Sequence, residues 1–199
     1  MNTLRWNPLL RDQLQWHWEH QLRPRLAGLT DEEYFWEPAP DSWSVRPRGT
    51  SSASVQGRAG SMTIDFAFPP PEPPPMTTIA WRLGHVIVGV LAMRNALHFG
   101  REPVDYESFE YATTATEALA QLDAEYSLWM AGVESLGDDH LDRPCGEHDF
   151  PDHPMAALVL HIHREVIHHL SEVSLLRDLY LHTAATDTGR NSDTKREAT

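Results

Sequence analysis

The sequence PMAALVLHIHREVIHHLSEVSLLRDLYLH, which spans residues 154–182, carries the clearest structural pattern in the chain. Each residue of a helix advances by about 100° around the axis, and this places one set of apolar side chains on about a third of the circumference. The set comprises Leu158, Ile162, Val166, Leu170, Val173 and Leu176. Pro154 suits the first turn of a helix, where its missing N–H leaves no hydrogen bond unmade. The pattern predicts one helix of roughly 28 residues and about 40 Å.

Three other segments share the helical spacing of apolar residues and predict three more long helices. They are residues 7–27, 79–99 and 116–136. Pro24 lies inside the first of these helices and should kink it or end it early. Thr114 and Glu117 have the spacing of a capping box at the start of the third. Four long helices without an alternation of strands and helices predict an all-α fold, a four-helix bundle.

Residues 46–76 are expected to form a long irregular excursion, rich in Ser, Gly and Pro, between the first two long helices. Within it, residues 61–68 alternate weakly, which is compatible with a strand or hairpin arm. Residues 69–75 are almost all proline and predict an extended polyproline spacer. One domain is expected over residues 1–184, followed by a polar, disordered tail over residues 185–199.

The composition bounds the class of protein. With 199 residues, 41% of them hydrophobic and 23% charged, the chain suits one folded domain. A net charge of −13 repels phosphate backbones and argues against a nucleic-acid partner. No apolar run approaches the length of a membrane span, and the first residues lack the pattern of a secretory signal, so a cytoplasmic location is expected. The single cysteine, Cys145, excludes an internal disulfide and a Cys-based zinc finger.

Glu165 and His169 are the residues of the last helix that most strongly suggest chemistry. They are four residues apart, so they are neighbours on the helix surface, and they fall within or beside the apolar stripe. A buried carboxylate must be neutralised, hydrogen-bonded or bound to a cation. A metal ion would satisfy the carboxylate and the imidazole together, with a third ligand from another helix. His85, in the apolar run of residues 83–87, is the obvious candidate.

An ordinary reading of the same residues stays open. A Glu and a His four apart often form only a hydrogen bond or an ion pair. His161 or His168 can replace one of the proposed ligands, and Glu172 can support the site from outside the first ring of ligands. The helix contains no HExxH motif, so its spacing does not match that of a common zinc hydrolase.

A second group of histidines, which includes His148 and His153, lies among acidic residues in the loop before the last helix. These residues are compatible with an accessory cation site or with the mouth of a substrate pocket. Charged loops are more often simply solvated, and we favour that reading. Cys145 lies in the same loop, and no base that would activate its thiol can be identified.

Three motifs resemble those of the DinB-like superfamily of small metal-binding four-helix bundles. They are DSWSVRP at residues 41–47, TIAWRLGH at residues 78–85, and the region of residues 161–180, with REVIHH and LLRDLY. The resemblance runs from about residue 10 to residue 182. It implies a metal held by one His of the second helix and by two His, four apart, of the last helix.

Carried onto this sequence, the resemblance implies that His85 and His169 are metal ligands. Glu165 occupies the position of the remaining His, and here the sequence departs from the three-His pattern. Glu165 can ligate directly, act through a water molecule, or mark a site that has lost its metal. A set of two imidazoles and one carboxylate suits zinc, nickel, iron or manganese, and ligand type alone does not choose among them.

The resemblance also implies a function, since similar proteins include S-transferases and isomerases that use bacillithiol, mycothiol or glutathione. We expect a divalent-metal-binding protein that acts as a metal-dependent transferase and activates a low-molecular-weight thiol for attack on a small-molecule substrate. The alternatives are a non-catalytic stress-related or interaction module, with a structural metal or none, and a bundle whose inward polar residues only form hydrogen bonds. A homodimer is an open expectation, with the apolar residues 61–68 as a contact surface.

Overall fold

The computed structural model describes residues 5–53 and 59–196, with side chains up to residue 183. Parts of three predicted segments therefore lie outside the described residues: residues 1–4 of the domain, 54–58 of the excursion and 197–199 of the tail. The protein is mostly helical and also contains a small two-stranded sheet, which departs from the expected all-α class.

The first helical segment contains a wide turn just before its proline. It consists of α1 (Trp6–His17), a π-helical stretch η1 (Trp18–Leu22) and α2 (Arg23–Arg25) without a break. Pro24 has no N–H to continue the hydrogen-bond ladder, and π turns are a common way to absorb such a defect. The expected effect of Pro24 is therefore confirmed, because the helix changes its winding and ends at Arg25. A short helix, α3 (Asp31–Tyr34), follows.

The second helical segment also changes its winding in the middle. It comprises α4 (Ile79–His85), the π-helical stretch η2 (Val86–Ala92) and α5 (Met93–His98), and it confirms the helix expected over residues 79–99. Thr78 caps it, because its side chain accepts a hydrogen bond of 3.1 Å from the N–H of Trp81.

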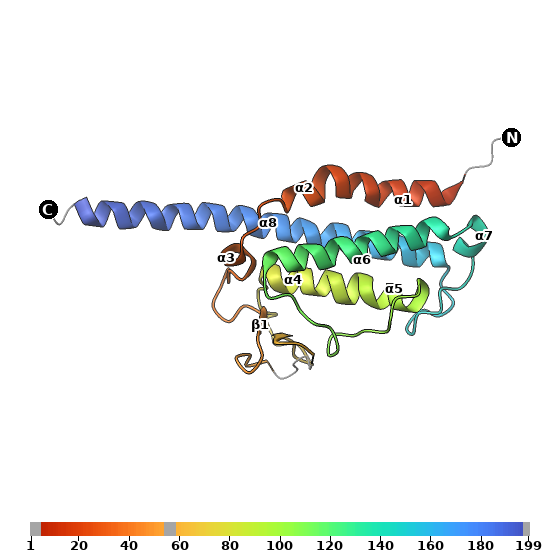
Figure 1. Cartoon of the computed structure of the whole chain (residues 1–199), viewed down its shortest axis with the longest axis horizontal. Coiled ribbons are helices and arrows are strands. Elements are labelled where there is room, and N and C mark those ends of the chain that lie inside the picture. Colours follow the sequence, from red (N-terminus) through yellow and green to blue (C-terminus); the bar gives the residue numbers. More distant parts are fainter. Residues whose placement is uncertain (1–4, 54–58, 197–199) are drawn as a thin grey trace.

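The remaining helices are α6 (Ala115–Ser135), α7 (Asp138–Leu141) and α8 (Met155–Arg196). Thr114 accepts a hydrogen bond from the N–H of Glu117 at the start of α6, as the capping-box spacing predicts. The long helices lie side by side (Figure 1), and contacts join α4 to α8, α6 to η2, and α1 to both α6 and α8. Leu14, Leu83, Trp129 and Leu170 are fully buried between them, so each of the four long segments contributes to one core.

The sheet anchors the excursion against the second helical segment. Strand β1 (Val45–Pro47) pairs antiparallel with β2 (Met62–Ile64), with Val45 opposite Ile64. The Ile64 side chain lies so close to Gly84 of α4 that a Cβ at residue 84 would approach it to 3.2 Å. The sheet therefore lies against the turn of α4 that precedes His85.

The strand expected over residues 61–68 is shorter than predicted. After Ile64 the Asp65 carboxylate turns inward to accept a hydrogen bond of 2.8 Å from Arg46 Nε, and the pairing with β1 stops. The side chains of Phe66 and Phe68 are exposed, the latter by 82%. Bends at residues 68–69 and 72–73 also interrupt the expected polyproline spacer.

Helix α8 continues well beyond residue 182, where the sequence predicts its end. Its backbone is helical to Arg196, and this part extends past the other helices (Figure 1). The domain limit at residue 184 and the disordered tail over residues 185–199 stay predictions. Within the described ranges, no helix has the length and apolar character needed to cross a membrane.

Candidate metal site

The contact between α4 and α8 brings His85 and His169 together, although they are far apart in the sequence. Their ring centroids lie 4.7 Å apart, and the rings are nearly perpendicular. His85 is the last residue of α4 before the π-helical stretch, and His169 lies beside the apolar stripe of α8 and is 9% exposed. The two helices thus bring a half-buried and a buried imidazole together, as the sequence suggested.

Two carboxylates of α8 contact opposite sides of the His169 ring. Glu165 Oε2 lies 3.4 Å from His169 Nε2, and Glu172 Oε2 lies 2.8 Å from His169 Nδ1. Arg82 Nη1 lies 3.1 Å from the same Glu172 oxygen. Glu172 therefore fixes the ring through Nδ1 and leaves Nε2 on the side of Glu165. In metal sites such a carboxylate commonly orients the ligand imidazole.

His85 is held in place by two aromatic residues. Its Nδ1 lies 2.7 Å from the Tyr106 hydroxyl, and its ring stacks on Trp81 at a centroid distance of 5.5 Å. Burial lowers the pKa of His85 to about 4, and the nearby His169 and Arg82 act in the same direction. His85 is therefore neutral at pH 7, which is the state that a metal ligand requires.

Gly89 makes room for the hydroxyl group that holds His85. A Cβ at this position would lie 1.8 Å from the Tyr106 hydroxyl oxygen, so no larger residue fits without displacing Tyr106. The glycine lies within η2, one turn after His85. The π-helical stretch η2, Gly89 and Tyr106 thus act together to position the His85 ring.

The other predicted ligands lie on the outer side of α8. His161 Nδ1 is 3.5 Å from Glu165 Oε1, and His168 Nε2 is 3.6 Å from Glu172 Oε1. Among the described residues, one group of three offers ligand atoms that all lie within 4.8 Å of one another, and it consists of His168, His169 and Glu172. This group shares His169 with the set predicted from sequence, but it takes all its members from one helix.

The charges at this position fit a divalent cation. Glu165 and Glu172 carry two negative charges and Arg82 carries one positive charge, so with neutral imidazoles the cluster has a net charge of −1. Imidazole and carboxylate are suitable ligands for zinc, iron, nickel and manganese. The donor types and their charges therefore fit the metal that the sequence resemblance implies.

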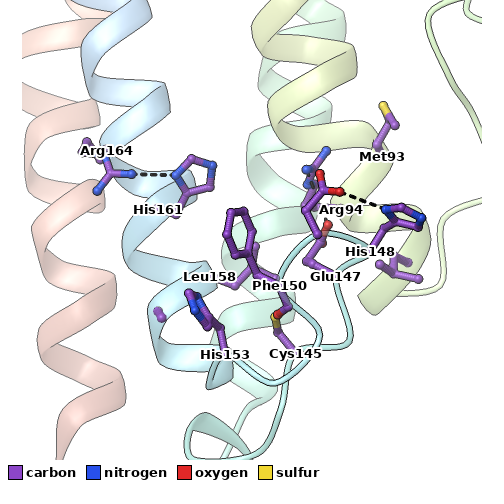
Figure 2. Close-up of a pocket in the computed structure, with 13 residues that line it drawn as sticks. Met93, Arg94, Cys145, Glu147, His148, Phe150, His153, Leu158, His161 and Arg164 are labelled. Atoms are coloured by element: carbon purple, nitrogen blue, oxygen red, sulfur yellow. Dashed lines mark hydrogen bonds and ion pairs between the residues drawn. The ribbon is translucent and has the colours of Figure 1, made fainter.

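A pocket of about 780 Å³ lies nearer the start of α8 than Glu165 and His169 do (Figure 2). It is bounded by α5, by the first turns of α8 and by the loop of residues 143–154. His161 and Arg164 line it, and His161 also contacts Glu165, so the pocket begins one helical turn from Glu165 and about two turns from His169. The ligand candidates themselves do not line it.

The same pocket bears on the interpretation of the loop histidines. His148, His153 and Cys145 all line it. The sequence left open whether this region is a substrate mouth or a solvated loop, and we favoured the solvated loop. In the structure His148 and His153 are exposed, as a solvated loop requires, and they also line this pocket, so both readings stay open.

Sequence reasoning missed the residues that hold the two imidazoles. Arg82 and Tyr106 are not ligand types, and Tyr106 comes from the connection between α5 and α6. Arg82 lies three residues before His85, a spacing that places both on one face of a helix, and this signal was available. Nothing in the sequence near Tyr106 indicates its contact with His85.

A mostly helical protein that gathers imidazoles and carboxylates from two helices has the form of a metal-binding helical protein. A family model described as the DinB superfamily matches residues 52–173, which is more than half of the chain. The chain therefore belongs to the DinB superfamily. No curated protein and no solved structure shows a significant match to it.

Proposed function

We propose that this protein is a four-helix bundle of the DinB type that binds a divalent metal through His85, Glu165 and His169. The observation that supports the proposal most directly is the 4.7 Å contact between the rings of His85 and His169, across two helices, with Glu165 at His169 Nε2. Membership of the DinB superfamily supports it independently. Zinc, nickel, iron and manganese all suit the donor set.

The neighbours of the ligands have separate roles in this proposal. Glu172 accepts a hydrogen bond from His169 Nδ1–H, which leaves Nε2 free to face the ion, while Arg82 keeps Glu172 in position. Tyr106 does the same for His85 by binding its Nδ1. A bound divalent cation lowers the pKa of a coordinated water or thiol, which is the chemistry that it would supply here.

We propose further that the protein is a metal-dependent transferase that activates a low-molecular-weight thiol. The pocket of about 780 Å³ that begins at His161 supports this step, since it offers room for a small molecule one helical turn from Glu165. In the reaction a thiol sulfur forms a bond to an electrophilic carbon. The leaving group departs with its electron pair, and the thiol proton passes to solvent.

Metal analysis of protein purified without an affinity tag tests the site. We expect one divalent ion per chain, and a rise in melting temperature when that metal is returned to chelator-treated protein. His85→Ala should abolish this rise, while His168→Ala, the matched control on the outer side of α8, should leave it unchanged. A native protein that takes up no divalent ion would contradict the proposal.

The same pair of variants separates the proposed site from the alternative group on α8. If His168→Ala abolishes metal-dependent stabilisation and His85→Ala does not, then His168, His169 and Glu172 hold the metal. The metal would then bind to α8 alone and not between α4 and α8, and one of its ligands, His168, would be largely exposed.

A thiol screen tests the activity. Bacillithiol, mycothiol and glutathione are each mixed with benzyl chloride, and the release of chloride is followed with native, chelator-treated and His169→Ala protein. We expect acceleration by the metal-loaded native protein alone with one of the thiols. Equal rates with all three preparations would refute the transferase.

The second candidate function is a non-catalytic interaction module. The exposed side chains of Phe66 and Phe68 favour it, because apolar groups at a surface often mark a contact with a partner. A second copy of the chain is one such partner, and a homodimer stays a prediction that light scattering can check. Under this function the thiol screen gives no acceleration, although metal is bound.

A further inference from the structure

The pocket near the start of α8 has the form of a ligand site in its own right (Figure 2). Its volume of about 780 Å³ falls within the range of about 300–1,000 Å³ that is usual for small-molecule sites. Its walls include a set of apolar side chains: Met93, Leu97, Phe150, Ala157 and Leu158. Leu97 and Phe150 are more than half exposed, so a ligand body would cover apolar surface that now faces solvent.

The acidic groups of the pocket already have partners. Glu147 lies between Arg94 and His98, with one oxygen 3.4 Å from Arg94 Nη2 and the other 3.1 Å from His98 Nε2. Asp149 lies 2.9 Å from His148 Nδ1. Glu147 is therefore paired with the Arg94 guanidinium, whereas Asp149 is 80% exposed.

The donors of the pocket, in contrast, are only partly used. Arg164 is 69% exposed and holds His161 Nδ1 at 2.7 Å, with a longer contact of 3.6 Å to Glu165. Arg94 Nε is buried without a hydrogen-bond partner. The His153 ring stacks on Phe150 at 5.0 Å, and no hydrogen bond to its nitrogens occurs within the described residues. The Arg164 guanidinium and the His153 ring can therefore donate to a ligand that supplies acceptors.

We propose that this pocket binds a small organic anion with an apolar body. The anionic group lies at Arg164, and the body lies against Leu97 and Phe150. The proposal of a binding site depends only on the pocket. Its role as the substrate site rests on the proposed function. In that role the pocket holds the electrophile one helical turn from Glu165, and the substrate class is an arylalkyl or alkyl carboxylate that carries a leaving group.

Binding of three matched probes tests the charge preference. 4-Phenylbutyrate, 4-phenylbutanol and 4-phenylbutylamine share one apolar body and differ in charge, and calorimetry or NMR titration gives their affinities for native protein. We expect the acid to bind about tenfold more tightly than the alcohol, and the amine most weakly, because a charge-assisted hydrogen bond contributes about this factor. Equal affinities for the three, or no saturable binding of the acid, would overturn the proposal.

Two variants with matched controls test the position of the site. Leu97→Glu places a negative charge at an exposed pocket residue, and Leu160→Glu places the same charge at an exposed residue of α8 outside the pocket. Arg164→Gln removes the donor, and Arg25→Gln removes an exposed arginine of α2. We expect each pocket variant to weaken 4-phenylbutyrate about tenfold and each control to leave its affinity unchanged. Equal effects of variant and control would place the probe elsewhere.

Chelator-treated protein separates this proposal from the metal site. We expect 4-phenylbutyrate to bind metal-free native protein and His169→Ala nearly as well as the metal-loaded protein. If the acid binds but no divalent ion does, the proposed function fails and the pocket stands. If the metal binds but no probe does, the pocket proposal fails alone.

Discussion

His163 and His169 lie six residues apart on α8, and both are almost completely buried. His169 faces α4, where two carboxylates and the His85 ring surround it. His163 faces the opposite part of the core, with its ring 6.2 Å from that of Trp129. Neither of its ring nitrogens has a hydrogen-bond partner of standard geometry among the described residues.

The difference between these histidines shows what separates a ligand candidate from a core residue. Burial is common to both, and so is membership of the histidine-rich stretch of residues 161–169. Only His169 is surrounded by polar groups that together suit a cation, namely two carboxylates of α8 and the His85 ring of α4. Convergence of partners, and not burial or local composition, identifies the site.

The largest expected effect is the loss of metal in His169→Ala. We expect metal affinity to fall by more than about 1,000-fold, because even changes outside the first ring of ligands cost about 10- to 100-fold. His163→Leu should retain native affinity, although it removes an equally buried histidine of the same helix. Titration of chelator-treated protein followed by calorimetry measures both. Similar losses of metal affinity in the two variants would mean that His169 is no more a ligand than His163 is.

His163 should instead control stability in acid. Burial lowers the pKa of His163 to about 4, although the nearby Leu10 backbone acts in the opposite direction. Because the unfolded chain binds this proton more readily, the stability from neutral His163 is present above pH 6.5 and is lost as the pH falls towards 4. The expected loss is roughly 3 kcal/mol, from about 1.4 kcal/mol for each pKa unit.

The control for this pH dependence is His163→Leu. Denaturant unfolding of chelator-treated protein between pH 4 and pH 8 should show a flatter profile for the variant than for the native chain. Parallel profiles would mean that His163 titrates in the folded protein as it does in the unfolded chain.

Gly89→Ala tests whether Gly89 and Tyr106 position the His85 ring. The new Cβ would displace Tyr106, and overpacking of this kind costs about 1–3 kcal/mol. Metal affinity should also fall by about 10- to 100-fold, as His85 loses its orienting partner. Tyr106→Phe is the milder companion, since it removes the hydroxyl without a clash. Thermal unfolding with and without metal separates the two effects, and an unchanged affinity in both variants would exclude Tyr106 from the site.

Glu172→Gln should give the smallest effect in this series. The amide can still contact His169 Nδ1, but it loses the charge that Arg82 and the imidazole share. We expect metal affinity to fall about tenfold. Glu134→Gln, at an exposed carboxylate of α6, is the control. A complete loss of metal in Glu172→Gln would instead make Glu172 a direct ligand, as in the group with His168 and His169.

Periodicity predicted the helical segments because an apolar stripe requires only local repetition. The cap at Thr114 forms as its spacing indicates. The proximity of His85 and His169 also followed, since both lie on faces that a compact helical fold must bury. The stripes and caps depend on residues within a few turns of one another, and the His85–His169 contact follows once the buried faces of α4 and α8 meet.

The features that sequence could not supply depend on contacts between distant segments. The pairing of Val45 with Ile64 and the contact of Tyr106 with His85 join residues with no common local pattern. The pocket is also of this kind, because α5, α8 and a loop enclose it together. The group of His168, His169 and Glu172 is local, yet only side-chain positions show that its ligand atoms converge.

The π-helical stretch η2 determines how the candidate metal ligand and the pocket residues of this helical segment are oriented relative to each other. His85 lies just before it, and the pocket residues Met93, Arg94 and Leu97 lie just after it. Arg94 binds the Gly89 carbonyl inside the stretch at 2.8 Å. Deleting one residue between 86 and 92 would favour ordinary α-helical winding and rotate α5 about its axis. In such a shortened chain His85 should still face α8, whereas Met93, Arg94 and Leu97 should turn away from the pocket. The extra residue in η2 therefore allows one helical segment to serve both candidate sites.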